Sequence, residues 1–518
     1  MRTSFLTFSL GLVLAGCSAE QTEPENPFAY RASVPSQIDD AYYQRADAAV
    51  QSRIPESFVP GAKNVILFVG DGMGVSTVTA MRIYAGQIQG LDGESYKLAM
   101  EQLPHAAFSR TYSHDYQVPD SAATATAMVS GVKTKSGTIG VGSGVARGNC
   151  ATQAENVVDS LFEMAEQQGL ATGIVSTARI THATPASAYA KSASRDWEDD
   201  MSFDSTGNPG CPDIAKQLIE WPAGDGFEIA MGGGRRHFLT DETFDPEYDT
   251  GTGRRADERD LIVEWTSKSD AHEVVFSGSE FTAIDFDTDV RVLGLFEPSH
   301  MQYELDRAED PAGEPSLSEM TQAAITRLSQ DEDGYVLMVE SGRIDHAHHG
   351  VNAARALVDG VAFDDAISAA IEMTDSSETL IIVTADHSHT MTMAGYPRRN
   401  NPILGKVAFE TGAIARAADG KPYTTIGYIN GPTACQADDE ILDCAREDLS
   451  SVDTTSPDYR QQAAIFMPSE THSGEDVPIF ASGPGSELVR GVMDQNEIFH
   501  VMGYASGLVA ASESDATE

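Results

Sequence analysis

The chain is 518 residues long, and 41% of its residues are hydrophobic and 22% are charged. These proportions are ordinary for a globular protein and exclude extensive disorder, while the length allows one large α/β domain or about two or three average ones. The 34 basic and 79 acidic residues give a formal net charge of −45, which disfavours nucleic acids and anionic membranes as partners. We interpret the acidity as a solubility adaptation to salty surroundings, so an anionic ligand needs a local positive site such as metal ions or arginine.

The N-terminus has the features of an export signal. Residues 1–16 combine a basic residue with an apolar run that is too short to span a bilayer. The run ends in Leu-Ala-Gly-Cys at Cys17, which resembles the lipobox of bacterial lipoproteins and implies cleavage before Cys17 and lipidation of its thiol. An ordinary secretory signal with a coincidental cysteine is the alternative. A serine behind the cysteine, here Ser18, resembles the pattern of lipoproteins that are sorted to an outer membrane. Residues 17–34 suit a lipidated tether.

This N-terminus predicts an exported protein at the outer membrane, in the periplasm or at the cell surface, which contacts the membrane only through its lipid anchor. An exported chain enters an oxidising compartment, where an even number of cysteines predicts disulfides. Three pairings of the remaining cysteines are open, and short sequence separation favours Cys150 with Cys211 and Cys435 with Cys444. A structural zinc site is the weaker alternative, because the chain has no CxxC pair.

Apolar runs typical of strands alternate with helical patterns along the chain. The predicted strands are residues 65–69, 173–176, 227–231, 335–339, 380–383 and 478–481, and apolar helical faces recur at 157–165 and 363–371. This alternation predicts an α/β fold with a central, mostly parallel sheet and helices on both faces. Residues 238–320 and 395–460 are rich in Asp, Glu, Gly and Pro, so we expect insertions over the sheet. Residues 506–518 read as a loose acidic tail.

Most chemistry-bearing residues follow the predicted strands directly. Ligands in such sheets bind outside the carboxyl ends of the strands. The strand at 335–339 leads into Glu-Ser-Gly-Arg-Ile-Asp-His-Ala-His-His, and the strand at 380–383 leads into Thr-Ala-Asp-His-Ser-His. Carboxylates and imidazoles at strand ends predict a metal site, with a solvated His-rich loop as the alternative. His472 is the exception, since it precedes the strand at 478–481.

Three further positions suit phosphate chemistry, although each has a plainer interpretation. Asp71 lies where a strand breaks into glycines, which a tight turn would also explain. Ser121 begins an Ala-rich helix, where an anion would meet free N–H groups, but this motif taken alone favours a plain helix cap at Asp120 or Ser121. Arg195 could clamp two phosphate oxygens with its guanidinium or make a surface salt bridge.

Together these runs resemble the alkaline phosphatase family over about residues 35–505. The matching runs are GDGMG, PDSAATATA, THATPASAYA with SRDW, MGGGR, LFEP, ESGRIDHAHH, TADHSH, YRQQ and ETHSGEDV, in the order of that family. Because histidines stand at His182 and His346, the chain most resembles the branch of the family that contains the animal enzymes. The resemblance implies an alkaline phosphatase catalytic domain at 35–505 with a small crown insertion at about 395–435. It also implies a homodimer that hydrolyses small phosphate monoesters.

The resemblance also implies roles for individual residues. Ser121 is expected to be the nucleophile that forms a phosphoserine, with possible phosphotransfer to alcohols, and Arg195 to clamp the phosphate. The implied ligands are Asp345, His349 and His472 for one Zn²⁺, Asp71, Asp386 and His387 for a second Zn²⁺, and Asp71, Thr184 and Glu340 for Mg²⁺. A Ca²⁺ site would use Glu247, the Phe296 carbonyl, Glu297 and an acid between Asp310 and Glu314, with Glu314 favoured by the Pro-Ser-Leu that follows it.

The remaining histidines are expected in supporting positions. His389 would orient a zinc-bound carboxylate, His182 and His346 would lie near the magnesium and the phosphate, and His348 would be packed. Two other functions stay open at this stage. One is a phosphodiesterase or sulfatase of the same superfamily, and the other is a non-catalytic lipoprotein that binds metal or phosphate.

Overall fold

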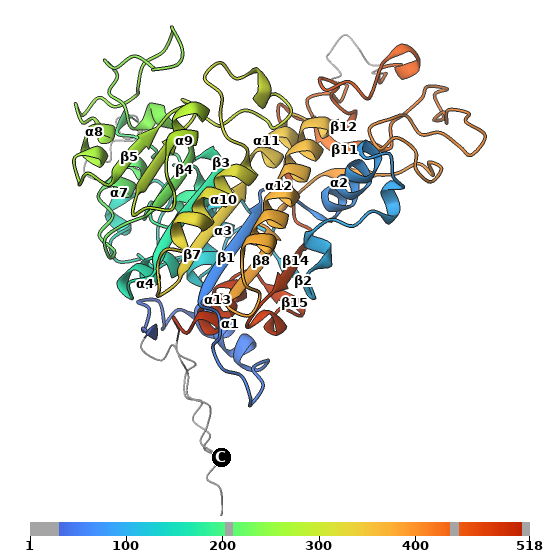
Figure 1. The fold of residues 1–518 in the computed structure, drawn as a ribbon. Helices are drawn as coiled ribbons and strands as arrows, with labels where there is room; N and C mark the ends of the chain where they lie inside the picture. Colours follow the sequence, from blue (N-terminus) through green and yellow to red (C-terminus); the bar gives the residue numbers. More distant parts are fainter. Residues whose placement is uncertain (1–30, 202–210, 436–444, 510–518) are drawn as a thin grey trace, which may run out of the picture.

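A ten-stranded sheet forms the centre of the computed structural model, which describes residues 31–201, 211–435 and 445–509 (Figure 1). From one edge to the other, its strands are β15 (Gly491–Asp494), β2 (His105–Arg110), β14 (Val477–Ser482), β8 (Thr379–Ala385), β1 (Asn64–Gly70), β7 (Tyr335–Ser341), β3 (Ala171–Arg179), β4 (Ile229–Gly233), β6 (Arg291–Leu295) and β5 (His272–Val275). All neighbouring pairs are parallel except the two made by β14, which is antiparallel to β2 and to β8. The prediction of a mostly parallel sheet is therefore confirmed.

Two different sets of helices cover the two faces of this sheet. One face packs against α1 (Ala41–Gln51), α3 (Ser121–Ser130), α4 (Leu161–Gln167), α5 (Ala183–Ala186), α7 (Ile214–Ile219), α8 (Leu261–Thr266) and α13 (Glu497–Ser506). The other face packs against α2 (Val75–Ile88), α9 (Gly278–Ala283), α10 (Leu317–Leu328), α11 (Arg343–His349) and α12 (Ala353–Met373). This arrangement confirms the prediction of helices on both faces.

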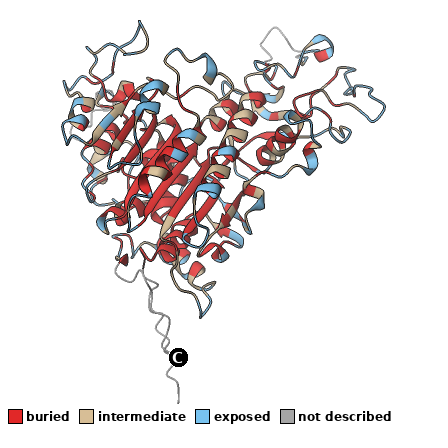
Figure 2. Ribbon diagram, in the orientation of Figure 1, coloured by how far each residue is buried: buried red, intermediate tan, exposed pale blue. Residues whose placement is uncertain are grey.

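The apolar runs of the central strands explain why they lie in the middle of the sheet. Alternate residues of β1 point to opposite faces, so Val65 and Leu67 join the core on one side while Ile66 and Phe68 join the core on the other. A strand that is covered on both faces needs a nearly continuous apolar run, and a parallel sheet provides such cover. Figure 2 shows the result, with buried central strands beneath helices that are exposed on their outer sides.

All of the predicted strands are present, but the expectation for residues 238–320 is wrong in part. This segment contains two strands of the main sheet, β5 and β6, in addition to surface loops. Both strands are short, and β5 lies at the edge of the sheet with only one of its four residues buried. Their apolar pattern is therefore weak against the acidic surroundings.

A smaller region rises over one end of the sheet. It contains a three-stranded sheet of β10 (Met391–Met393), β11 (Ile426–Gly431) and β12 (Ala463–Phe466), beside α2 in Figure 1. Long loops between these strands include the predicted crown at 395–435. A two-stranded sheet ties β9 (Ser388–His389) to β13 (His472–Ser473). It brings a distant part of the chain next to the end of β8.

The packed domain extends slightly beyond both predicted boundaries. Arg31 is buried, and Ser33 forms a β-bridge with Val509. Helix α13 reaches Ser506, and the first four residues of the predicted tail are buried. The predicted signal peptide, the lipidation site Cys17 and residues 510–518 lie outside the described residues. Within the ranges that are described, no helix has both the length and the apolar character needed to cross a membrane.

A disulfide joins Cys150 to Cys211, as predicted. Their sequence separation is 61 residues, and the bond ties the loop after α3 to the start of α7. Cys435 is also disulfide-bonded, while its predicted partner Cys444 lies outside the described residues.

Candidate active site

The ends of several strands bring the predicted site residues to one edge of the main sheet. Asp71 follows β1, Glu340 lies near the end of β7, and Asp386 follows β8. His472 reaches the same edge although it precedes its strand, because β14 is antiparallel to β8 and therefore begins where β8 ends. The exception in the sequence is thus explained by the one reversed strand.

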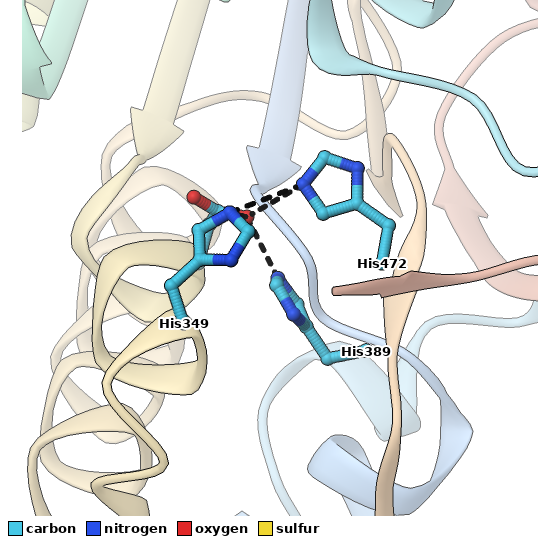
Figure 3. A group of neighbouring side chains, drawn as sticks. His349, His389 and His472 are labelled. Atoms are coloured by element: carbon cyan, nitrogen blue, oxygen red, sulfur yellow. Dashed lines mark hydrogen bonds and ion pairs between the residues drawn. The ribbon is translucent and has the colours of Figure 1, made fainter. Parts of the chain in front are cut away.

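The first group of ligands, called the histidine cluster, consists of Asp345, His349, His389 and His472. The potential ligand atoms of these four residues all lie within 4.8 Å of one another. Figure 3 shows the three imidazole rings converging on one carboxylate oxygen. This oxygen is Asp345 Oδ1, which lies 2.7 Å from His389 Nε2 and 3.4 Å from Nε2 of both His349 and His472.

Backbone carbonyls determine how two of these rings are turned. His349 Nδ1 donates to the carbonyl of Glu470 at 2.6 Å, and His472 Nδ1 donates to the carbonyl of Pro119 at 2.9 Å. In the neutral rings both Nε2 atoms therefore carry lone pairs, yet these two atoms lie only 3.2 Å apart. Such lone pairs repel each other unless a cation lies between them. Imidazole with carboxylate is a donor set that suits zinc.

His389 is held differently from its neighbours. Its Nε2 donates to Asp345, and its Nδ1 donates to Glu470 Oε2 at 2.5 Å. Burial alone would lower the pKa of His389, but the two carboxylates outweigh it and raise that pKa to about 10. Both nitrogens of His389 are engaged as donors, so the ring can orient Asp345 but has no lone pair for a metal.

The second group, called the nucleophile cluster, consists of Asp71, Asp386 and His387. All three side chains are fully buried, and their ligand atoms lie within 4.8 Å of one another. Both carboxylate oxygens of Asp71 are buried without a hydrogen-bond partner in the part of the chain that the structure describes. Burial, together with Asp386 and Asp345, raises the pKa of Asp71 well above its usual value. A buried carboxylate in this state is unfavourable unless a cation accompanies it, so the donor set fits a metal ion.

Ser121 lies beside the nucleophile cluster, at the start of α3. Asp120 caps this helix by accepting from the Ala123 N–H, and Gly131, with φ of 77°, ends it in a left-handed conformation. The Ser121 hydroxyl lies 3.2 Å from His387 Nε2. A nucleophilic hydroxyl, a helix N-terminus and a cluster of metal ligands therefore meet at one point.

Arg195 lies next to this serine through a chain of polar contacts. Its Nη1 forms an ion pair with Asp120 Oδ2 at 3.1 Å, and its Nη2 contacts His182 Nε2 at 3.0 Å. Burial would raise the pKa of Asp120, but Arg195 and the Gly137 N–H lower it below its usual value. The fixed carboxylate holds the guanidinium near Ser121, where it can bind phosphate oxygens.

The third group lies at the position that the resemblance implies for Mg²⁺. It consists of Asp71, Glu340 and a ring nitrogen of His182, within 4.8 Å of one another. The hydroxyl of Thr184, which is an implied magnesium ligand, is also buried without a hydrogen-bond partner among the residues described. Glu340 accepts a short hydrogen bond from Ser176, and burial raises the pKa of Glu340 to about 7. Unsatisfied buried oxygens again fit a cation at this position.

Two other histidines border the third group, and one of them was not predicted. His346 lies 5.6 Å from His182, measured between ring centroids, and 4.0 Å from His300. His300 also contacts Arg179 Nη1 through Nε2 at 2.5 Å. No motif in the sequence pointed to His300, since it follows the LFEP run without a pattern of its own. His348 is packed, as expected, and bonds Thr77 and Tyr428.

Three of the acids predicted for the calcium site lie close together, with Asp310 as the member from the stretch between Asp310 and Glu314. Glu247, Glu297 and Asp310 have carboxylate oxygens within 4.8 Å of one another, whereas Glu314 is outside this group. Glu314 Oε1 accepts from the Gln302 N–H at 2.9 Å, which turns that oxygen to the backbone. The Phe296 carbonyl accepts from Arg235 Nη1 at 2.9 Å.

Comparison with known proteins identifies the family of the chain. The family model described as alkaline phosphatase matches residues 62–508. The chain is 45% identical to the tissue-nonspecific alkaline phosphatase of Gallus gallus over 86% of this chain and 84% of that one. It is 42% identical to the tissue-nonspecific isozyme of Homo sapiens with the same coverage.

Solved structures show the same fold. Thermus thermophilus alkaline phosphatase has a TM-score of 0.62 and 26% identity, over 92% of this chain and 96% of that one. The alkaline phosphatase of the Antarctic bacterium TAB5 has a TM-score of 0.58 and 24% identity, over 87% and 99%. A mutant of that enzyme was solved with magnesium bound. From the match along most of its length, the chain belongs to the alkaline phosphatase family.

Proposed function

We propose that this chain hydrolyses phosphate monoesters through a covalent phosphoserine on Ser121. Hydrolysis of phosphate monoesters is the activity of its family, and the proposal concerns the route. The observation that carries it is the Ser121 hydroxyl at 3.2 Å from His387, beside the buried carboxylate of Asp71, whose two oxygens lack hydrogen-bond partners within the described residues.

Three sets of side chains would hold the metal ions. Asp345, His349 and His472 would bind one Zn²⁺, Asp71, Asp386 and His387 a second Zn²⁺, and Asp71 and Glu340 with Thr184 or His182 one Mg²⁺. When bound, two zinc ions would lower the pKa of the serine hydroxyl and stabilise the oxygen of the leaving alcohol. Metal content of the purified protein tests this set, and we expect two zinc ions and one magnesium ion per chain.

The side chains of the site account for the remaining steps. Ser121 Oγ loses its proton and attacks phosphorus while the bond between phosphorus and the alcohol oxygen breaks. The leaving oxygen takes up a proton to give the alcohol, and a phosphoserine remains. Arg195 and the backbone N–H groups at the start of α3 bind the equatorial phosphate oxygens, where negative charge gathers. Water then cleaves the phosphoserine, releases inorganic phosphate and restores the hydroxyl. An alcohol in place of water would give a transfer product.

Removal of the nucleophile tests this route. We expect Ser121→Ala to lose most turnover of a nitrophenyl phosphate monoester, and alcohol acceptors to divert phosphate into transfer products in the unmodified protein. Normal turnover by Ser121→Ala would contradict the covalent route. Faster hydrolysis of the corresponding diester than of the monoester would favour a phosphodiesterase instead.

We extend the proposal to one Ca²⁺ near Glu247, Glu297 and Asp310. Both carboxylate oxygens of Asp310 are buried without a hydrogen-bond partner in the described ranges. Burial and the neighbouring Glu297 raise the pKa of Asp310 to about 6, which a bound cation would reverse. Calcium should raise the melting temperature of the unmodified protein but not that of Asp310→Asn. An equal increase in both proteins would exclude this site.

We also propose that the chain is a lipid-anchored homodimer. An apolar groove of about 530 Å³ between α2 and the β2–β15 edge supports the dimer, because Val75, Phe108 and Val492 leave apolar surface exposed there. Light scattering should report a dimer, and Phe108→Glu should give a monomer. For the anchor, Cys17→Ser should abolish incorporation of labelled fatty acid and release the protein from membranes.

A further inference from the structure

We propose that Glu470 is a positioning residue that fixes the histidine cluster in the orientation needed to bind a cation. The inference rests on the proposed function, because it concerns one of the two expected zinc sites. Glu470 lies two residues before His472, is 1% exposed, and was not among the residues predicted from the sequence. Its contacts, not its place in a motif, indicate the role.

Glu470 is bonded to two histidines of the cluster at once. Its backbone carbonyl accepts from His349 Nδ1 at 2.6 Å, and its Oε2 accepts from His389 Nδ1 at 2.5 Å. The other carboxylate oxygen accepts from both the N–H and the hydroxyl of Thr390, each at 2.6 Å. The carboxylate is therefore fixed by the backbone of the segment that carries His389, and it cannot turn away from the ring.

These bonds determine which nitrogens face the ligand position. The bond to the carbonyl leaves His349 with its lone pair on Nε2, toward His472. The bond to the carboxylate points His389 Nε2 at Asp345 Oδ1, the oxygen on which the rings converge in Figure 3. His389 also packs against His349 and His472, with ring centroids 4.9 Å and 5.1 Å apart. A rotation of His389 would therefore disturb Asp345 and both neighbouring rings.

Two substitutions separate positioning from charge. Glu470→Ala removes every side-chain acceptor, so it frees His389 and leaves the buried Thr390 N–H without its partner. Glu470→Gln removes only the charge, because the amide oxygen can still accept from Thr390. Its NH₂ can donate to Nδ1 of His389, whose proton then lies on Nε2 toward Asp345. Positioning thus predicts a defect in the alanine variant and recovery in the glutamine variant.

The experiment uses the full chain, stripped of metal and titrated with zinc, and cadmium-113 NMR of the cadmium-loaded protein. We expect Glu470→Ala to weaken one of two zinc sites about 10- to 100-fold, as loss of such supporting partners does in other metal sites. One cadmium resonance should shift and the other should stay. Glu470→Gln should stay within about threefold of the parent on the same scale. Glu475→Ala is the matched control, since Glu475 is on the same loop and accepts from Ser388 at 2.7 Å.

Each outcome of this experiment supports or overturns the positioning role of Glu470. Parental zinc affinity in Glu470→Ala, or equal weakening in the alanine and glutamine variants, would overturn positioning by hydrogen bonds. If the alanine variant does not fold, Glu470→Asp, which withdraws the carboxylate from His389, takes its place with the same expectation. A parent protein that binds no zinc would refute the proposed metal site and this role together. A normal parent with a normal alanine variant would refute the role alone.

Discussion

Glu166 should destabilise this protein at alkaline pH, and Glu166→Gln should remove that effect. Glu166 is 4% exposed on α4, where Oε1 accepts from the Thr172 hydroxyl at 2.5 Å. Burial first, and then the nearby Glu228, raise the pKa of Glu166 from 4.5 to about 8. Glu228 is buried too, and it accepts from the Thr172 N–H at 2.7 Å. The buried carboxylates of Glu166 and Glu228 therefore both accept hydrogen bonds from Thr172, which places them close to each other.

The sign and size of the effect follow from this pKa. A carboxyl whose pKa is raised on folding binds its proton more tightly in the folded state, so its stabilising effect is present below pH 4.5 and is lost as the pH rises to 8. A tenfold difference in proton affinity between the folded and unfolded states corresponds to about 1.4 kcal/mol, so the parent loses on the order of 5 kcal/mol relative to Glu166→Gln across this window. At roughly 2.1 cal/mol/K per residue, a domain of this size gains about 1 °C per kcal/mol.

Thermal unfolding at pH 5 and at pH 9 measures the prediction. Glu166→Gln should melt about 5 °C above the parent at pH 9, and the gap should close at the lower pH. Glu155→Gln is the control, because Glu155 is exposed on the surface. A gap between Glu166→Gln and the parent that did not depend on pH would refute the reasoning, since a packing effect would not titrate.

Three further changes have expected outcomes. Arg195→Ala should lower kcat/KM about 100- to 1,000-fold, because it removes charge-assisted bonds to the phosphate worth about 1.5–3 kcal/mol each, and Arg195→Lys should recover only part of the rate; the full parental rate in Arg195→Lys would contradict bidentate binding. Cys150→Ser should reduce the free energy of unfolding by about 4 kcal/mol in non-reducing denaturation, because the bond closes a loop of 61 residues; unchanged stability would show that the bond does not constrain the unfolded chain. Phe363→Ala should destabilise by about 3–5 kcal/mol in urea, because Phe363 is fully buried against Phe68; a smaller loss would mean that α12 closes the cavity.

The parts of the fold that could be predicted are those that are buried on both faces. Strands β1, β7 and β8 have continuous apolar runs, and such runs are visible in a sequence. Strand β2, in contrast, is His-Ala-Ala-Phe-Ser-Arg with only two buried positions, and β15 has one buried residue. The place of β2 in the sheet depends on its pairing with β14, and that of β15 on its pairing with β2. Local periodicity does not record such pairing.

The sequence could predict which residues gather at the metal sites, but not how each histidine ring is turned there. Motif order brings His182 near the third group, but the ring is turned by Arg195, whose Nη2 holds Nε2 at 3.0 Å. The opposite nitrogen, Nδ1, is buried without a hydrogen-bond partner in the described part of the chain. A contact between residues 13 positions apart thus holds the imidazole where one of its nitrogens lies within 4.8 Å of ligand oxygens of Asp71 and Glu340. Spacing along a chain carries no such information.

The charge of the chain and the charge of its substrate can now be reconciled. The three groups at the sheet edge contain four carboxylates, those of Asp71, Glu340, Asp345 and Asp386, and carry four negative charges at an alkaline pH at which all four are ionised. Arg195 brings a positive charge to the site, but its ion pair with Asp120 offsets much of that charge. Without metal ions, these charges would therefore repel a phosphate monoester, as the acidic surface would. With the proposed three divalent cations, six positive charges face four negative ones, and the site becomes attractive. Binding of phosphate, and not only its turnover, then depends on the metal ions, since they alone reverse the local charge.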